Sequence, residues 1–428
     1  MSKTLDLQLL LLQMRPPGET DWIELTNDAS DPERAWAINT VNISWQRSSP
    51  RDHLEPGDYS IDILMHPDSI DAEILEYDTE IKLSAYVLET RAPQHRWPTL
   101  LHGWITSWER GLKRPDGRYI YHLGIIDAIG RAAATTIGDK PWPHEPGFNR
   151  GDRLNALSRS GPLITGDMPG NVGPRDVDNV ALLDVARSIC TPGTIIGIDE
   201  YDTSKITARF SGSLQYAPES AVRLPASLIE DTGRRLDRSA MLTEIGITAH
   251  WNVNAMEEKS TRTIYGARRH GWTTSRWSID TDQTFWTKDG VDRAIKWAER
   301  TINESSTPAI YLPGSPRILL NRNVPVPEIT MLLHAGSRYN SAIEILDPPS
   351  DIEPIHLVIG GSIEVKGMSV KLALTLVPAG VYGVRRVRWK EINQALDVFT
   401  NRRTRYNNWP DPTFPADRFR DFTQRSIT

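Results

Sequence analysis

The sequence predicts a mainly β protein with a minor α-helical part, that is, an α+β fold. Segments that alternate apolar and polar residues follow one another from Gly57 to Arg131, and such alternation is typical of half-buried antiparallel strands. The chain contains 30 proline and 29 glycine residues, which suits many turns. Two stretches show the helical spacing of apolar residues, so helices are expected but few.

The first β region is expected over residues 1–135. Strands are predicted near residues 1–12, 37–43, 59–64, 81–87, 101–108 and 119–125, and residues 13–35 are expected to form a loop. The sequence KRPDGR before the last strand predicts a hairpin turn, because proline presets φ and glycine accepts a positive φ. This strand spacing favours a sandwich or barrel. The small residues after Asp127 predict a short helix at its end.

An α/β region is expected over residues 136–235. Asp152 is in a position to cap a helix that continues through Leu157. Residues 176–190 show the clearest helical pattern, and the following TPG ends it. The segments GTIIGIDE and SKITARF then predict a small sheet.

A second β-barrel region is expected over residues 236–380. Residues 245–249 and 372–376 alternate as one-sided strands do. Residues 291–303 show the apolar spacing of a helix. The two β regions look like a loose internal duplication. The sequence therefore predicts two β-barrel domains with a small intermediate α/β region.

Residues 381–428 differ from the rest in charge. They hold ten basic and five acidic residues in a chain whose net charge is −6, so this segment is about +5 and the remainder about −11. We expect an extended arm that docks on a neighbouring subunit, because arginine and aromatic residues are favoured interface anchors. The expected interface residues are Trp389, Arg402, Arg403, Arg405, Tyr406, Trp409 and Phe414. Stacking on single-stranded nucleic acid is the alternative role for this arm.

No familiar catalytic or cofactor-binding motif occurs in the sequence, so we expect no enzyme, metal or cofactor. His250 and His270 flank one predicted hairpin, but a zinc site needs three or four ligands, so ordinary histidines are expected there. The single cysteine, Cys190, lies in an apolar helical pattern and is expected to be buried. The run LQLLLLQM is too short to span a membrane, so neither membrane insertion nor a signal peptide is expected.

Four segments of the first β region resemble, in order and spacing, the N-terminal barrel of minor tail proteins from tailed bacteriophages of actinobacteria. They are SWQRSSPRDHLEPGDYSIDI, YDTEIKLSAYV, TLLHGWITSWER and YHLGIIDAIGRAA. Pro56–Gly57, Gly103 and Asp127 occupy motif positions of that family, and His102 stands where it often has an aromatic residue. The segments ALLDVARSI, LPASLIEDTGRRLDRSAMLTEIGIT and HLVIGGSIEVKGMSVKLALTLVPAG are similar to later parts of a baseplate-hub protein.

The resemblance, which covers most of residues 20–380, implies a structural virion protein of the tail tip. Hub proteins of this kind have two related β-barrels of tail-tube type per subunit. Three subunits then present six barrels, so a homotrimer joins the sixfold tail tube or distal tail ring to threefold tip proteins. The implied partners are the distal tail protein, the tape measure protein and other minor tail proteins. The resemblance also implies that the protein is made in the host bacterial cytoplasm and becomes part of the virion.

Three further expectations accompany this resemblance. The acidic bulk charge favours a channel lining that repels passing phage DNA without binding it specifically. A hexameric distal tail protein, with one barrel per subunit, is the alternative within the same class. A cell-wall carbohydrate-binding tail protein is the alternative of another class, with Trp104 and Trp108 beside Glu109 as its candidate residues.

Overall fold

A computed structural model shows the fold of the chain. It describes residues 10–26, 36–48, 52–65, 75–85, 99–138, 142–158, 164–166, 170–175, 177, 179–190, 194–198, 203–210, 222–225, 235–237, 242–253, 256–265, 276–281, 295–299, 301–302, 309–311, 317–320, 342–348, 354–366 and 369–379.

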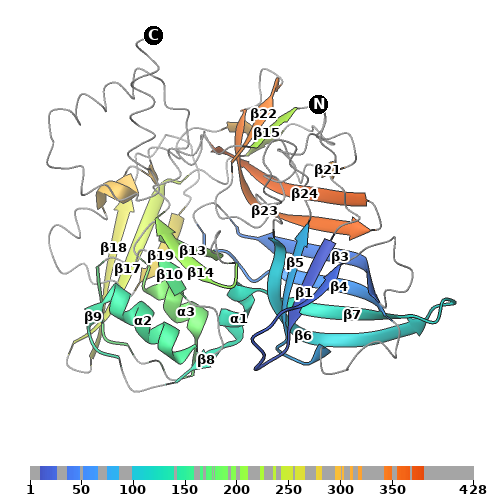
Figure 1. Ribbon diagram of the computed structural model, residues 1–428. Coiled ribbons are helices and arrows are strands. Elements are labelled where there is room, and N and C mark those ends of the chain that lie inside the picture. Colours follow the sequence, from blue (N-terminus) through green and yellow to red (C-terminus); the bar gives the residue numbers. More distant parts are fainter. Residues whose placement is uncertain are drawn as a thin grey trace, which may run out of the picture.

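A twelve-stranded sheet dominates the molecule (Figure 1). One part of it consists of the N-terminal strands, which pair antiparallel. In spatial order these are β3 (Trp36–Gln46), β4 (Asp58–Met65), β7 (Tyr119–Ile126), β6 (Thr99–Lys113), β5 (Glu80–Ala85), β1 (Leu10–Arg15) and β2 (Ile23–Thr26). The strands predicted within 37–43, 59–64, 101–108 and 119–125 are confirmed. Those near 1–12 and 81–87 are confirmed over residues 10–12 and 81–85, since the rest of each lies outside the described residues. The expected loop over 13–35 is wrong at residues 13–15, which belong to β1, and at β2, because a turn at Gly18 with φ of 87° folds this short segment back onto β1.

The C-terminal strands continue the same sheet beyond β3. They are β23 (Ile355–Lys366), β24 (Ser369–Pro378), β22 (Ala342–Leu346), β21 (Arg317–Leu320) and β15 (Val222–Pro225). Strand β23 pairs with β3 over seven residues, from Gly360 opposite Gln46 to Lys366 opposite Thr40. Segments more than 300 residues apart in the sequence therefore lie edge to edge.

One hydrophobic core serves both parts of this sheet. Val41 and Ile43 of β3 are buried in the same cluster as Ile363 and Val365 of β23. Their alternation with polar residues explains why one face of each strand is buried. The pairing path of the described strands ends at β15 and β2 and does not close, so the two separate barrels remain a prediction.

The α/β region packs against the end of the N-terminal strands. Its helices are α1 (Ala128–Ala134), α2 (Gly147–Leu157) and α3 (Leu182–Ser188). Its strands are β10 (Ile164–Gly166), β13 (Thr194–Ile198) and β14 (Ile206–Phe210), with the small pairs β8 (Thr136–Ile137) and β12 (Val180–Ala181), and β9 (Glu145–Pro146) and β11 (Asn171–Val172). These elements share a second hydrophobic core.

The helix predictions hold in this region, with different starting points. Helix α3 begins at Leu182 and not at 176, because Val180 and Ala181 pair with β8. Asp152 lies inside α2 and does not cap it, since the helix already begins at Gly147 after the extended Pro146. The short helix predicted after Asp127 is confirmed as α1, and the structure adds that the Asp127 side chain caps it.

A third group of strands lies beside α3 (Figure 1). Strands β17 (Glu244–Val253), β18 (Met256–Tyr265) and β19 (Arg276–Thr281) form this sheet, and β16 (Arg235–Asp237) pairs separately with β20 (Ala309–Tyr311). Residues 295–299 and 301–302 are helical, as predicted, and Ala298 and Ile302 pack on Ile245 and Ile247. The predicted unit 236–380 is thus shared between this sheet and the large one.

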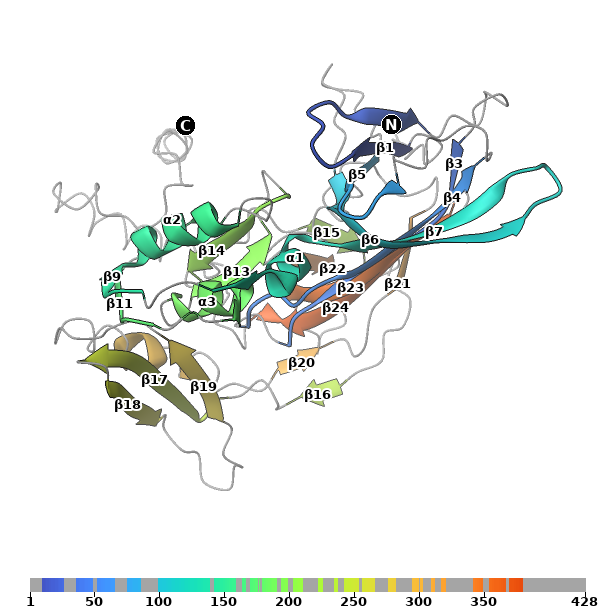
Figure 2. The ribbon, with the colours of Figure 1, turned by 90° about the horizontal axis from the view of Figure 1, so that it is seen from below.

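Strands β6 and β7 extend beyond the body of the protein as a hairpin (Figure 2). The turn follows the prediction from KRPDGR: the Gly117 N–H donates to the Arg114 carbonyl at 3.0 Å, and Gly117 has a φ of 86°. Only glycine adopts this φ without strain, which explains its position after Pro115 and Asp116.

We expect Gly103→Ala to destabilise the protein by about 1–3 kcal/mol, as overpacking does. A Cβ at this position would lie 2.4 Å from the Ile126 carbonyl oxygen and 2.7 Å from Cγ2 of Ile125. Denaturant unfolding measures the loss. Gly111→Ala on the same strand is the matched control, because its Cβ would meet the nearest atom, Nε2 of His122, at 3.2 Å. Equal losses in the two variants would contradict this explanation.

Candidate functional site

The residues singled out from the sequence for docking are outside the described part of the chain. Residues 381–428 contain all seven of them, so the arm and its anchors remain predictions. His270 also lies outside, and His250 belongs to β17. Within the described residues, no group of three or more His, Cys, Asp or Glu could hold a metal ion. No helix of the described part is long and apolar enough to cross a membrane.

A buried carboxylate connects the strand ends to α1. Asp127 Oδ2 accepts hydrogen bonds from the Gly57 N–H at 3.1 Å and the Tyr59 hydroxyl at 2.9 Å. Its Oδ1 accepts from the Gly130 N–H at 2.6 Å, which caps the helix. Burial raises the pKa of Asp127, and these hydrogen bonds oppose part of that rise. The pKa of Tyr59 is also raised, first by burial and then by the adjacent carboxylate.

The glycine positions of the resemblance surround this carboxylate and have steric reasons. A Cβ on Gly57 would lie 2.3 Å from the Tyr59 hydroxyl oxygen and 2.8 Å from the Ser44 carbonyl oxygen. Gly103 lies against the backbone of Ile126, the residue before Asp127. The motif positions Gly57, Gly103 and Asp127 therefore belong to one packing arrangement that joins β4, β6 and α1.

A second polar network lies between β1, β5 and β6. His102 Nε2 donates to Glu80 Oε1 at 2.7 Å, since a carboxylate can only accept, and Nδ1 is then free to accept from the Thr203 hydroxyl at 2.9 Å. Arg15 also binds Glu80 through Nε at 3.0 Å. Burial raises the pKa of Glu80, but the hydrogen bonds from His102 and Arg15 outweigh it and hold that pKa below its usual value.

The His102 ring occupies the place of an aromatic residue. It stacks on Trp104 with centroids 5.9 Å apart and meets the edge of Trp22 at 6.2 Å. The Arg131 guanidinium lies over the Trp104 ring, 4.3 Å from its centroid, in a cation–π contact. Trp104 is only 7% exposed, so it has no free face for a sugar. Trp108 is 46% exposed and remains accessible.

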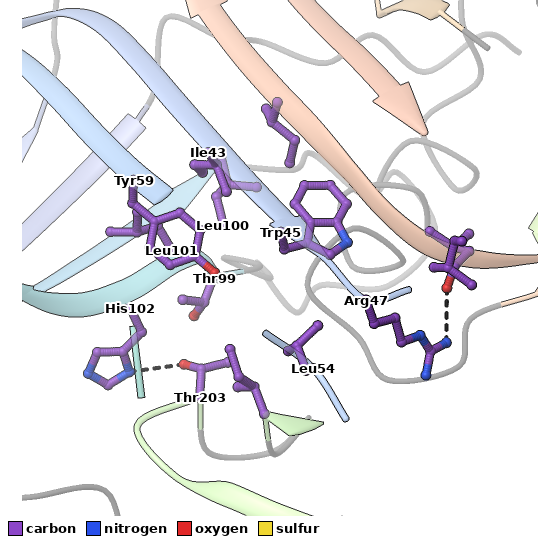
Figure 3. Close-up of a pocket in the computed structure, with 14 residues that line it drawn as sticks. Ile43, Trp45, Arg47, Leu54, Tyr59, Thr99, Leu100, Leu101, His102 and Thr203 are labelled. Carbon is purple, nitrogen blue, oxygen red and sulfur yellow. Dashed lines mark hydrogen bonds between the residues drawn. The ribbon is translucent and has the colours of Figure 1, made fainter. Parts of the chain in front are cut away.

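The large sheet and the α/β region meet at a pocket (Figure 3). Trp45, Leu101 and Tyr59 line it from the sheet, and Thr203 faces it from the α/β region. Its free volume is about 40 Å³, which is room for a few water molecules. Beside it, Arg47 Nη2 donates to the Val358 carbonyl at 3.1 Å and ties β3 to β23 a second time. The pocket is a gap between packed layers.

A loop carrying His53 fastens the sheet to β13. The His53 Nδ1 accepts from the Ile196 N–H at 2.9 Å, and the Leu54 N–H donates to the Ile196 carbonyl at 2.9 Å. Arg187 Nη2 donates to the Leu54 carbonyl at 3.0 Å. Burial, followed by the charge of Arg187, lowers the pKa of His53 to about 4. The imidazole is therefore neutral at pH 7 and able to accept.

Cys190 behaves as the sequence predicts. Its thiol is buried in the core of the α/β region, and burial raises its pKa to about 12. It is a packing residue with almost no thiolate at neutral pH.

Comparison with known proteins identifies the class of fold. No family model matches the sequence, and no curated protein matches it. The structure is similar to the 43 kDa tail protein of prophage MuSo2 from Shewanella oneidensis, with a TM-score of 0.51 and 9% identity over 87% of this chain and 99% of that one. The chain therefore has the fold of a phage tail protein.

Two further solved structures align over similar lengths. The tail protein of Neisseria meningitidis MC58 has a TM-score of 0.47 and 11% identity, over 88% of this chain and 99% of that one. An Escherichia coli component of the type VI secretion system, itself described as similar to the T4 tail proteins gp27 and gp5, has a TM-score of 0.46 and 12% identity, over 87% of this chain and 79% of that one.

We expect Asp127→Ala to destabilise the protein by about 3 kcal/mol or more, because it leaves the part-buried Gly57 N–H, the buried Gly130 N–H and the Tyr59 hydroxyl without an acceptor. Tyr59→Phe removes only the hydrogen bond from the Tyr59 hydroxyl to Asp127 Oδ2. We expect this variant to lose about 1 kcal/mol of stability. Chemical denaturation compares the two. A larger loss for Tyr59→Phe would show that the carboxylate is not the centre of this network.

The contribution of His53 to stability should fall as the pH falls from about 6.5 to about 4. The unfolded His53 binds a proton near pH 6.5 and the folded one only near 4, so within this window the unfolded state holds more protons. The loss is at most about 3 kcal/mol for this histidine, and its contribution is constant below pH 4. His356, whose pKa burial lowers to about 4, acts in the same direction.

Thermal unfolding of the wild type and His53→Asn across this pH range tests the assignment. Asparagine retains an acceptor but does not titrate, so the variant should lose less stability on acidification than the wild type. Parallel curves for the two proteins would rule out a role for His53.

Proposed function

We propose that this protein is a structural component of a phage tail, and that it acts as the hub at the tail tip and not as an enzyme. The observation that carries the proposal is the tail-protein fold, which aligns with 99% of the length of the Shewanella oneidensis prophage tail protein. At 9% identity the similarity shows only a common architecture. The role of the chain in a phage particle is therefore our proposal.

The shared sheet supports the hub role in particular. The pairing of β3 with β23 sets two groups of strands from distant parts of the chain side by side. A chain with two such groups can supply two sectors of a ring, so three chains supply six. A homotrimer of this kind would match the sixfold tail tube or distal tail ring on one side and threefold tip proteins on the other.

The channel and the partners follow from the same proposal. The distal tail protein and the tape measure protein would bind at the tube side, and other minor tail proteins at the tip. The net charge of −6 favours a lining that repels DNA during its passage. Residues 381–428 would anchor one neighbour through their arginine and aromatic side chains.

Two other functions remain as alternatives. A hexameric distal tail ring would use one strand group per subunit for the channel, and the similarity of the fold to tail proteins also suits it. A cell-wall carbohydrate-binding protein would have to rely on Trp108, because Trp104 is buried between His102 and Arg131.

A reconstruction of the phage particle that carries this protein tests the proposal. We expect density for the chain at the tail tip, in three copies, with both strand groups facing the channel. Six copies in a ring would support the distal tail protein, and density outside the tail tip would contradict the hub.

Deletion of residues 386–428 should leave a soluble, folded protein that fails to join the tail. The physical reason is that the deleted arm supplies anchors to a neighbour and not to the core of its own subunit. Circular dichroism and thermal unfolding of the truncated chain measure folding, and complementation of a deletion phage measures assembly. Misfolding of the truncated chain would show that the arm belongs to a core, and normal infectivity would remove its docking role.

A further inference from the structure

The β6–β7 hairpin leaves one strand edge without a partner among the described residues. Strand β5 accompanies β6 only up to Trp104, opposite Glu80, and Ile105 still exchanges backbone hydrogen bonds with Asp78 and Thr79. From Thr106 to Lys113 the described strands contact β6 only from the β7 side. In this subsection, residues 106–118 are called the arm, which is distinct from the C-terminal segment 381–428. Figure 2 shows the arm extending away from the sheet.

Both faces of the arm's β6 strand are open to solvent. Residues 106–110, 112 and 113 are exposed, and Leu112 is 87% exposed. A two-stranded ribbon is marginally stable in water by itself, and a free strand edge is a template for another strand. Within the arm, Arg118 binds Asp116 at 2.7 Å and the Arg110 guanidinium lies 5.1 Å from the Tyr119 ring centroid.

The arm is basic although the chain is acidic. It carries Arg110, Lys113, Arg114 and Arg118, against Glu109 and Asp116. Asp116 is already paired with Arg118, so the edge presents an excess of positive charge beside the apolar Leu112. A matching surface would be a strand edge with acidic residues and an apolar contact.

Such an edge exists at the end of the same sheet. Strand β2 is the last strand of the pairing path, so its outer side has no partner among the described strands. The turn before it and the strand itself expose Glu19, Asp21 and Glu24, and Ile23 is 37% exposed. We call residues 17–24 the acidic edge. Strands β5 and β1 lie between β6 and β2, so the two edges cannot pair within one chain.

We propose that the arm of one copy of this chain binds the acidic edge of a second copy. The outer side of β6 would add to the outer side of β2, with Leu112 near Ile23 and the arm's basic residues near Glu19, Asp21 and Glu24. The contact joins two different surfaces, so it repeats from copy to copy and forms a ring wherever the rotation closes. It rests on the two edges and not on the proposed tail-tip role.

Charge reversal of each surface tests the contact in the full-length protein. The arm variant carries Lys113→Glu and Arg114→Glu, and the edge variant carries Glu19→Lys, Asp21→Lys and Glu24→Lys. Arg110 and Arg118 are left unchanged because they contact Tyr119 and Asp116 within the hairpin. Sedimentation velocity at low salt should show self-association of the wild type that weakens as salt rises. Each variant alone should associate at least about tenfold more weakly.

An equimolar mixture of the two variants provides the decisive measurement. In the mixture, the arm of the edge variant meets an unaltered acidic edge, and the reversed arm meets the reversed edge. Association should therefore return to about the wild-type level, which a general effect of net charge would not produce. Lys366→Glu with Lys371→Glu, exposed on β23 and β24, is the matched control and should associate as the wild type does.

Three outcomes would overturn the proposal. They are a wild type that stays monomeric at low salt, an arm or edge variant that associates like the wild type, and a mixture that stays as weak as its components. Thermal unfolding of each variant is the folding control. A midpoint close to that of the wild type shows that lost association comes from the altered surface charges and not from misfolding. Particle symmetry does not enter this test, so the tail-tip role can fail while the contact holds.

Discussion

The pairing of β3 with β23 is the interaction on which the rest of the structure depends. It joins strands from the two ends of the described chain, and it allows one core to serve both. Two glycines make the close approach feasible: a Cβ on Gly360 would lie 2.8 Å from the Trp45 carbonyl oxygen, and one on Gly361 would lie 2.8 Å from Cζ2 of Trp45. Arg47 strengthens the junction by donating to the Val358 carbonyl.

Around this sheet, buried polar groups determine how the other elements attach. Asp127 holds Gly57, Tyr59 and Gly130 together, so the strand ends and α1 keep one relative position. His53 performs the same task toward β13, and it does so only while its imidazole is neutral. Buried polar groups that have only one possible hydrogen-bond partner specify geometry more sharply than apolar packing does, because leaving such a group unpaired is costly.

The architecture is similar to that of a phage tail protein although the two sequences have little in common. At 9% identity the likeness to the Shewanella oneidensis tail protein lies in the arrangement of strands and in a common length. An open sheet with exposed terminal edges suits a protein that assembles, since strand edges readily accept further strands. The proposed contact between the hairpin and the acidic edge would use that property.

Local patterns in the sequence determined the elements: the N-terminal strands, the KRPDGR turn, the short helix after Asp127, the buried Cys190 and the helix near 295–302. These follow from alternation, capping and turn chemistry, which act between near neighbours. Tertiary structure alone decided that β23 joins β3, that β17–β19 pack elsewhere, and that Trp104 is buried while Trp108 is exposed. The alternation of apolar and polar residues shows which face of a strand is buried, but it does not show which other strand pairs with its edge. Pairing between distant strands depends on which edges meet when the chain folds.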